Sequence, residues 1–153
     1  MNPEKRIIEL GLDLSRPAAP IANYVPAVRV GNLLFLSGHG PQGPDGVFLT
    51  GKVGKDLSID EAYDAARMVG IGLLSALRAE LGNLNRVVRV VKTLGMVNSY
   101  DSFTDHPKVI NGTSDLFVDI FGELGRGARS AVGMGSLPNN IPVEVEMIFE
   151  VKE

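Results

Sequence analysis

Residues 58 to 81 hold the pattern that most constrains what this chain can fold into. Apolar side chains recur there at spacings of three and four residues, which places them on one face of an α-helix. The residues concerned are Ala62, Ala66, Val69, Leu73, Leu77 and Leu81. Ser58 and Glu61 have the spacing of a capping box at the start, and Gly82-Asn83 is typical of a helix end. The pattern therefore predicts one long amphipathic helix.

Strand patterns lie on both sides of this helix. Ala27 to Val30 and Leu33 to Ser37 predict a hairpin around the turn dipeptide Gly31-Asn32. A short edge strand is expected around Val47 to Leu49, within a loop rich in Gly and Pro. Arg86 to Val97 is apolar on both of its alternating faces, which favours a strand that is covered on two sides.

The C-terminal half predicts a second helix and two more strands. Thr104 to Phe121 can form a helix with an inward apolar stripe, ended by glycines. In the last strand, Val143 to Val151, the apolar side chains point one way and three glutamates point the other. Strands interrupted by two helices argue for an α+β fold, with a mixed β-sheet and both helices packed on one face.

Length and composition narrow the class of protein. A chain of 153 residues fits a single domain, residues 1–153, in which residues 1–26 are expected to form an extended N-terminal arm. The net charge of -3 provides no basic footprint for phosphates, which argues against a nucleic-acid partner. The sequence shows neither a signal peptide nor a membrane-spanning pattern, so we expect a cytoplasmic protein without membrane contact.

The chain offers few groups for metal or thiol chemistry. It has no cysteine, which excludes disulfides, a thiolate nucleophile and a cysteine metal site. Its two histidines, His39 and His106, lie far apart without metal-ligand spacing, so no metal site is expected. His39 follows the first hairpin within a Gly-rich stretch, and the sequence leaves open whether it faces a pocket or has no role.

Arg129 begins an otherwise small and apolar run, and its purpose is the main functional question. If Ser136 to Asn140 turns the chain between the last two strands, Glu144 lies opposite Ala131 or Gly133, on the same sheet face as Arg129. A guanidinium can hold a carboxylate through two bonds while a glutamate holds a water, so this arrangement predicts a pocket for a small acid. The alternative is a solvated or salt-bridged surface arginine.

Several segments together resemble the Rid family of reactive-intermediate deaminases, the YjgF-type proteins. They are ANYVPAV, VGNLLFLSGHGP, the long central helix, RVVRVVKTLGMVNS and ARSAVGMGSLPNNIPVEVE, within Tyr24 to Val151. The resemblance implies a chorismate-mutase-like fold assembled as a homotrimer, with sites in the clefts between subunits. It also implies hydrolysis of small 2-imino or enamine acids to 2-keto acids and ammonia, without a metal or cofactor.

The resemblance assigns roles residue by residue. The carboxylate-binding arginine falls on Arg129, and the glutamate that positions the attacking water falls on Glu144. The other substrate-binding positions fall on Tyr24, Ser37, Gly38 and Asn111. Where many members carry a cysteine this chain has Ala131, whose backbone carbonyl can still hold the water.

Three functions remain open at this point. The first is an imine or enamine deaminase, and the second is a non-catalytic protein that binds small carboxylates on the same trimeric scaffold. The third is an endoribonuclease, against which the acidic balance of the chain argues. The stretch Gly38 to Pro41 and the long N-terminal arm depart from the commoner family pattern and indicate a divergent subgroup.

Overall fold

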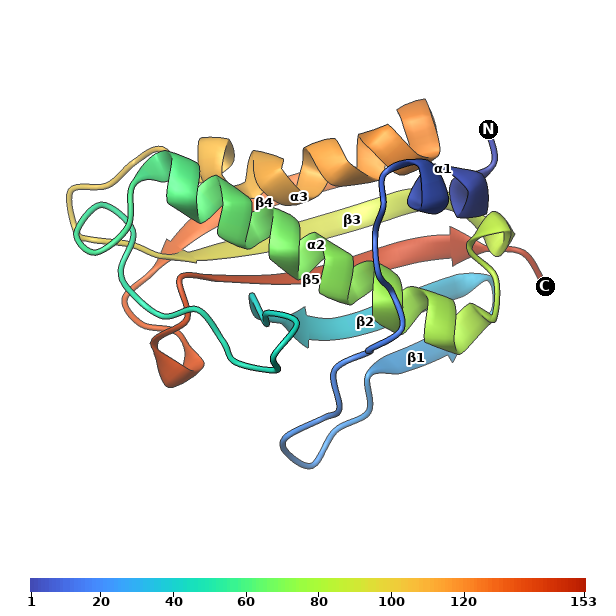
Figure 1. Cartoon of the computed structure of the whole chain (residues 1–153), viewed down its shortest axis with the longest axis horizontal. Helices are drawn as coiled ribbons and strands as arrows, with labels where there is room; N and C mark the ends of the chain where they lie inside the picture. Colours follow the sequence, from blue (N-terminus) through green and yellow to red (C-terminus); the bar gives the residue numbers. More distant parts are fainter.

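One five-stranded sheet forms the frame of the protein in the computed structural model, which describes residues 1 to 153. Its strands are β1 (Ala27–Val30), β2 (Leu33–His39), β3 (Val87–Asn98), β4 (Ala128–Met134) and β5 (Val143–Val151). They are ordered β1-β2-β5-β3-β4, and only the β3–β4 pair is parallel (Figure 1). The fold is therefore α+β with a mixed sheet, as the sequence predicts.

Two long helices cover one face of this sheet (Figure 1). They are α2 (Ile59–Leu81) and α3 (His106–Phe121). Ser58 caps α2 because its Oγ accepts a hydrogen bond from the Glu61 N–H, and Gly82 ends the helix in the left-handed conformation, with φ of 75°. The core lies between the two helices and the sheet, so the predicted stripes of both helices face inward.

Shorter elements complete the chain. They are helix α1 (Pro3–Glu9) and the 3₁₀ turns η1 (Leu84–Arg86), η2 (Gly122–Gly125) and η3 (Pro138–Asn140). We expected residues 1–26 to form an extended N-terminal arm, but Pro3–Glu9 within it is helical. Asn2 caps α1, Pro3 stands in its first turn and Ile7 is buried against the core, which together stabilise a helix there.

The short strand expected around Val47 to Leu49 does not form. Phe48 makes a single bridge to Gln42 within its own loop. Because the loop folds back on itself, these residues never reach an edge of the main sheet. The hairpin of β1 and β2 is confirmed, with the turn at Gly31 and Asn32.

The expected pairing of the last two strands is wrong. β3 lies between β4 and β5, and each of them is hydrogen-bonded to it. Met96 of β3 stands opposite both Val132 and Glu144, while its neighbour Gly95 stands opposite Ala131. Residues in one row share a face, so Ala131 and Glu144 face opposite sides of the sheet. β3 is therefore an interior strand with hydrogen-bonded neighbours on both edges, and it separates the two strands that the turn connects in sequence.

The sheet face away from the helices is uncovered, and apolar side chains lie on it among the glutamates of β5. Val28, Val30, Phe35 and Val132 all expose more than a third of their surface. Half-buried apolar side chains from the central strands lie between them on the same face: Leu94, Met96 and Ile148. We call this surface the open face.

None of the helices has the length and apolar character needed to cross a membrane.

Candidate functional site

Arg129 lies on the edge strand β4 and points toward α3. Its partner in the row is Thr93, which is buried on the helix side of the sheet. Arg129 Nη1 donates hydrogen bonds to Asn111 Oδ1 at 2.8 Å and to Ser114 Oγ at 3.1 Å. Both acceptors are neutral, and no carboxylate forms an ion pair with the guanidinium. The exposed arginine is thus oriented by α3 while its charge remains uncompensated within the chain.

Glu144 stands near the start of β5, against the end of β2. A side chain at Gly38 would lie 3.1 Å from Glu144 Oε2, so the glycine leaves room for this carboxylate. Burial raises the pKa of Glu144, and the nearby charge of Glu146 raises this pKa further, with no hydrogen bond opposing either effect. A half-buried, unpaired carboxylate with a raised pKa is the type of group that accepts a proton near neutral pH.

A β-bulge at the end of β2 shapes the wall beside Glu144. Leu36 pairs with Met147 and His39 pairs with Val145, so β2 contains one residue more than β5 over this stretch. Ser37 and Gly38 make up the bulge. The Ser37 hydroxyl donates a hydrogen bond of 2.6 Å to the Val25 carbonyl, which ties the N-terminal arm to the bulge.

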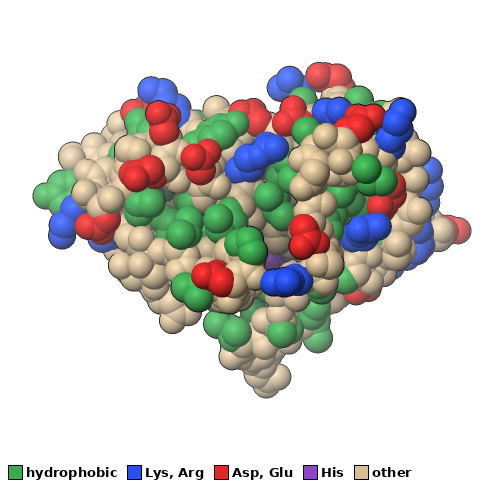
Figure 2. Space-filling view, in the orientation of Figure 1, with side chains coloured by type: hydrophobic (Ala, Val, Ile, Leu, Met, Phe, Trp, Pro, Cys, Tyr) green, Lys and Arg blue, Asp and Glu red, His purple; other side chains and the backbone are tan.

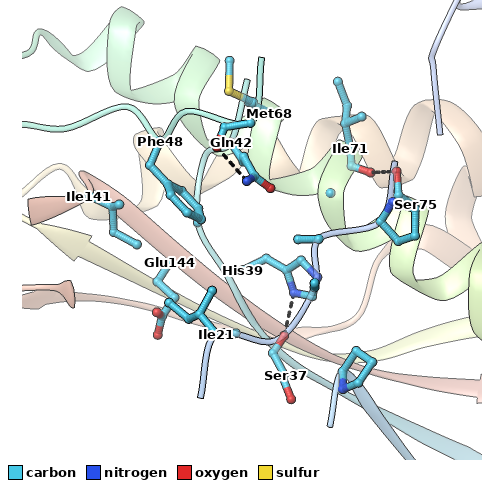
Figure 3. Close-up of a pocket in the computed structure, with 18 of the residues that line it drawn as sticks. Ile21, Ser37, His39, Gln42, Phe48, Met68, Ile71, Ser75, Ile141 and Glu144 are labelled. Atoms are coloured by element: carbon cyan, nitrogen blue, oxygen red, sulfur yellow. Dashed lines mark hydrogen bonds between the residues drawn. The ribbon is translucent and has the colours of Figure 1, made fainter. Parts of the chain in front are cut away.

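Four of the expected site residues line one cavity of about 1030 Å³. They are Tyr24 from the arm, Ser37 and Gly38 from the bulge, and Glu144 from β5. Figure 3 shows Ser37 and Glu144 at the border of this cavity, with apolar side chains from α2 and the Gly-rich loop above them. These residues come from segments far apart in the sequence, and the bulge brings them together.

The other expected residues form a separate group. Arg129 and Asn111 are hydrogen-bonded to one another but do not line the cavity, and Ala131 packs against the core beside them. Arg129 faces the helices, whereas Glu144 shares its row with Met96 on the open face. The two catalytic candidates do not share a face, contrary to the expectation from a terminal hairpin. A single chain therefore carries two half-sites.

Sequence reasoning missed two polar contributors to these half-sites. Ser114 supplies the second acceptor for Arg129, and its signal was its position three residues after Asn111 on the same helix. Glu146 raises the pKa of Glu144, and its signal was the two-residue spacing that places both glutamates on one strand face. His39, whose position the sequence left open, is buried and lines the cavity.

The fold and the sequence both match one class of protein, the α+β proteins of chorismate-mutase-like architecture. Residues 4–151 match the family described as "YjgF/chorismate_mutase-like, putative endoribonuclease". The chain belongs to this family, the Rid/YjgF proteins.

Individual relatives cover almost the whole chain. Protein TCP17 of Trypanosoma cruzi is 44% identical over 143 residues, which are 93% of this chain and 89% of that protein. The 2-iminobutanoate/2-iminopropanoate deaminase of Dermatophagoides farinae is 30% identical over 155 residues, covering 99% and 100%. A crystal structure of an Agrobacterium tumefaciens protein of unknown function superposes with a TM-score of 0.89 at 41% identity, covering 98% and 94% of the two chains.

Proposed function

We propose that this protein is a deaminase that hydrolyses small reactive 2-imino or enamine acids to 2-keto acids and ammonia. The observation that carries the proposal is the pair of uncompensated charges, the Arg129 guanidinium oriented by α3 and the half-buried Glu144 carboxylate. The name of the Dermatophagoides farinae relative, an imine deaminase of matching length, supports it.

A complete site in this proposal needs two copies of the chain. Arg129 and Glu144 face opposite sides of the sheet, so one chain cannot bring both to one small substrate. The uncovered open face and the edge strand β4 give each copy an apolar surface for a neighbour. We therefore infer a homotrimer in which Arg129 of one subunit meets the cavity of the next.

Each residue then has a role in the reaction. Arg129 binds the substrate carboxylate through two parallel hydrogen bonds, and Asn111 and Ser114 keep its guanidinium in place. Tyr24 forms the aromatic wall, while Ser37 and Gly38 form the wall beside the imine. The Ala131 carbonyl and the Glu144 carboxylate hold the water.

The chemistry requires one water, both of whose protons pass to the substrate nitrogen. The water oxygen attacks the imine carbon, and Glu144 takes a proton from that water as the new C–O bond forms. Glu144 gives this proton to the nitrogen, which completes a carbinolamine. Glu144 then takes the remaining hydroxyl proton and passes it to the nitrogen, so that the carbonyl forms as the C–N bond breaks and ammonia leaves. The residues contribute mainly by positioning, since placing water and imine in contact supplies much of the rate enhancement.

An imine-loss assay tests this proposal. Imino acids are generated in situ from several amino acids with an amino-acid oxidase, and the loss of free imine is followed with and without the purified protein. Faster loss that requires Arg129 supports the deaminase. A folded trimer that binds 2-keto acids but does not speed imine loss supports the carboxylate-binding alternative instead.

The pH dependence of the reaction should report the environment of Glu144. Glu144 must be ionised to accept a proton, so kcat/KM is full above its pKa and falls as the pH drops through that value. Burial and Glu146 both raise the pKa, which moves this acid limb above the range of an ordinary glutamate. Glu146→Gln removes the repulsion, so we expect the acid limb to move to lower pH.

The control for this profile is Glu150→Gln on the same strand. Glu150 accepts a hydrogen bond from Asn32 and contributes nothing to the pKa shift of Glu144. The profile of kcat/KM against pH should therefore be unchanged in Glu150→Gln. An acid limb that stays in place in Glu146→Gln, or moves upward, would contradict the assignment of Glu144 as the proton acceptor.

If the protein is a trimer, a charge introduced on the open face should separate the subunits. Val132 exposes 37% of its surface in the single chain, so Val132→Glu should leave the fold intact. In a trimer the new carboxylate would be buried in an apolar contact, and we expect it to yield monomers by light scattering with an unchanged circular dichroism spectrum. Ile8→Glu on α1, at a side chain that is 78% exposed, is the matched control. A trimeric Val132→Glu protein would show that this face is not the interface.

A further inference from the structure

The cavity extends well beyond the residues assigned to the reaction. Its inner part lies between the N-terminal arm, the Gly-rich loop and the side of α2 that faces His39, and we call it the arm compartment. It is lined by Ile21, His39, Phe48, Met68, Ile71 and Gly72. Figure 2 shows a hollow on this face, bordered by apolar side chains and with a histidine visible inside. None of these six residues has a role in the proposed chemistry.

The arm is fixed in place as the roof of this compartment. Leu14 is buried in the core, Arg16 Nη1 donates a hydrogen bond of 2.6 Å to the Pro44 carbonyl, and the Val25 carbonyl accepts from Ser37. The segment from residue 17 to residue 24 therefore spans two attached ends. In Figure 1 the dark blue chain that follows α1 crosses α2 before it reaches this segment, and the segment itself forms the loop that leads into β1.

The wall from α2 is a second face of that helix. Met68, Ile71, Gly72 and Ser75 follow the spacing of i, i+3, i+4 and i+7, and all four line the cavity. Met68 and Ile71 are only half-buried, and Phe48 opposite them is also half-buried. Apolar side chains that surround a hollow without filling it are typical of a small-molecule site rather than of a packed core.

Gln42 and Ser75 also line the cavity and donate hydrogen bonds to the Gly46 and Ile71 carbonyls, whereas His39 places an unpaired acceptor among the apolar side chains. Its Nδ1 lies 2.8 Å from the Ser37 carbonyl oxygen, which can only accept, so Nδ1 carries the proton. Burial lowers the pKa of His39 in spite of this hydrogen bond, so the ring is neutral and Nε2 is an acceptor. No side-chain nitrogen or oxygen is both enclosed and unpaired, so Nε2 opens into the compartment. Figure 3 shows the ring above Ser37, with Phe48 and Ile71 higher in the cavity.

We propose that the arm compartment binds the side chain of the substrate, and that the substrates are 2-imino acids with long apolar side chains bearing a hydrogen-bond donor. This inference rests on the proposed function. A cavity of about 1030 Å³ falls in the size range of sites for drug-sized ligands and far exceeds the needs of a three- or four-carbon acid. The apolar walls select a large hydrocarbon group, and His39 Nε2 accepts from its donor.

Binding of 2-keto acids, the stable products, tests the compartment without turnover. Calorimetry on the intact protein should give a Kd at least about tenfold lower for 4-methyl-2-oxopentanoate than for pyruvate, because each buried methylene contributes roughly a fourfold factor. 4-Hydroxyphenylpyruvate should bind more tightly than phenylpyruvate, because only the former carries a donor. Equal affinities for pyruvate and the larger acids would overturn the proposal.

Gly72 offers a way to fill the compartment without disturbing the helix. A Cβ at this position would meet only His39 Cδ2, at 3.6 Å, which is an ordinary contact. Gly72→Leu projects an isobutyl group into the space and should reduce the affinity ratio between 4-methyl-2-oxopentanoate and pyruvate to near one. Gly72→Ala should reduce this ratio only partly. Ala79→Leu adds a leucine on an exposed part of the same helix and is the matched control.

His39→Leu tests the polar atom separately. It should remove the preference for 4-hydroxyphenylpyruvate over phenylpyruvate, and a preference that persists would overturn the role of His39.

Failure of the deaminase proposal and failure of the compartment proposal would give different results. If the deaminase proposal fails but the compartment is a side-chain site, imine loss is absent while the keto-acid preference remains and disappears in Gly72→Leu. If only the compartment fails, imine loss is observed without any preference for large side chains.

Discussion

Arg129→Ala should abolish carboxylate binding and lower kcat/KM for imine hydrolysis by roughly two to three orders of magnitude. In the proposed site the guanidinium makes the charge-assisted contact to the substrate carboxylate, and removing one partner of such a hydrogen-bonded pair costs about 2–5 kcal/mol. The loss should appear both in the Kd for 2-keto acids by calorimetry and in the imine-loss rate. Arg129 is exposed and packs no core, so the folded state should be unaffected.

Two further variants test whether the loss depends on the planar guanidinium and on this particular arginine. Arg129→Lys keeps the charge but loses the planar fork, so it should recover only part of the affinity. Arg126→Ala removes an arginine three residues earlier that pairs with Glu123 at 3.1 Å, and it should bind keto acids like the parent protein. Full carboxylate affinity in Arg129→Ala would show that the site lies elsewhere on the molecule.

Glu144→Gln should remove turnover while leaving carboxylate affinity nearly intact. The amide has the same shape beside Gly38 but cannot take a proton from water, and general-base terms of this type are worth about 10²–10⁴-fold in rate. The measurement is kcat from imine loss alongside the Kd for a 2-keto acid. Glu150→Gln, on the same strand and face, is the matched control and should retain the parent kcat.

The two variants together decide between an enzyme and a binding protein. In a deaminase, Arg129→Ala loses affinity and rate, whereas Glu144→Gln loses rate alone. In a carboxylate-binding protein without turnover, Arg129→Ala still loses affinity and there is no rate for Glu144→Gln to change. A parent kcat in Glu144→Gln would remove Glu144 from the mechanism and leave the proton acceptor to another group.

Local patterns in the sequence were sufficient for most of the secondary structure. The capping box of Ser58 and Glu61 and the left-handed Gly82 bracket α2 within one residue of the expected bounds. Helix signals of this kind depend on near neighbours in the chain, so the sequence contains them directly. α1 was missed because its seven residues are too few to show a helical period, and its burial against the core is a tertiary contact.

Strand order was harder to predict, because pairing is a non-local property. A turn between Ser136 and Asn140 is compatible with a hairpin, and the sequence offered no direct sign that β3 would separate β4 from β5. The length and apolar character of β3 were the available clue, because edge strands are commonly short or charged, but they did not show which strands flank it. This one error reversed the face on which Glu144 lies relative to Arg129.

The arm compartment could not be predicted from the sequence for a similar reason. It exists because residues near position 21 lie against residues near position 71, and the intervening chain gives no periodic signal of that contact. Strand spacing and residue type pointed to Arg129 and Glu144, and the family resemblance added Ser37 and Tyr24. The division of these residues into two half-sites came only from the register of the sheet.

The β-bulge in β2 gives two adjacent residues separate effects on the cavity. In a regular strand Leu36 and His39 would face opposite sides, but the extra residue turns both toward the helices. Gly38 stays against the Glu144 carboxylate, while His39, the next residue, lines the arm compartment. Two adjacent residues therefore shape different parts of the cavity. Under the proposed function, mutation of His39 can change which ligands are accepted while Gly38 keeps the carboxylate accessible, so selectivity can drift under selection without loss of turnover.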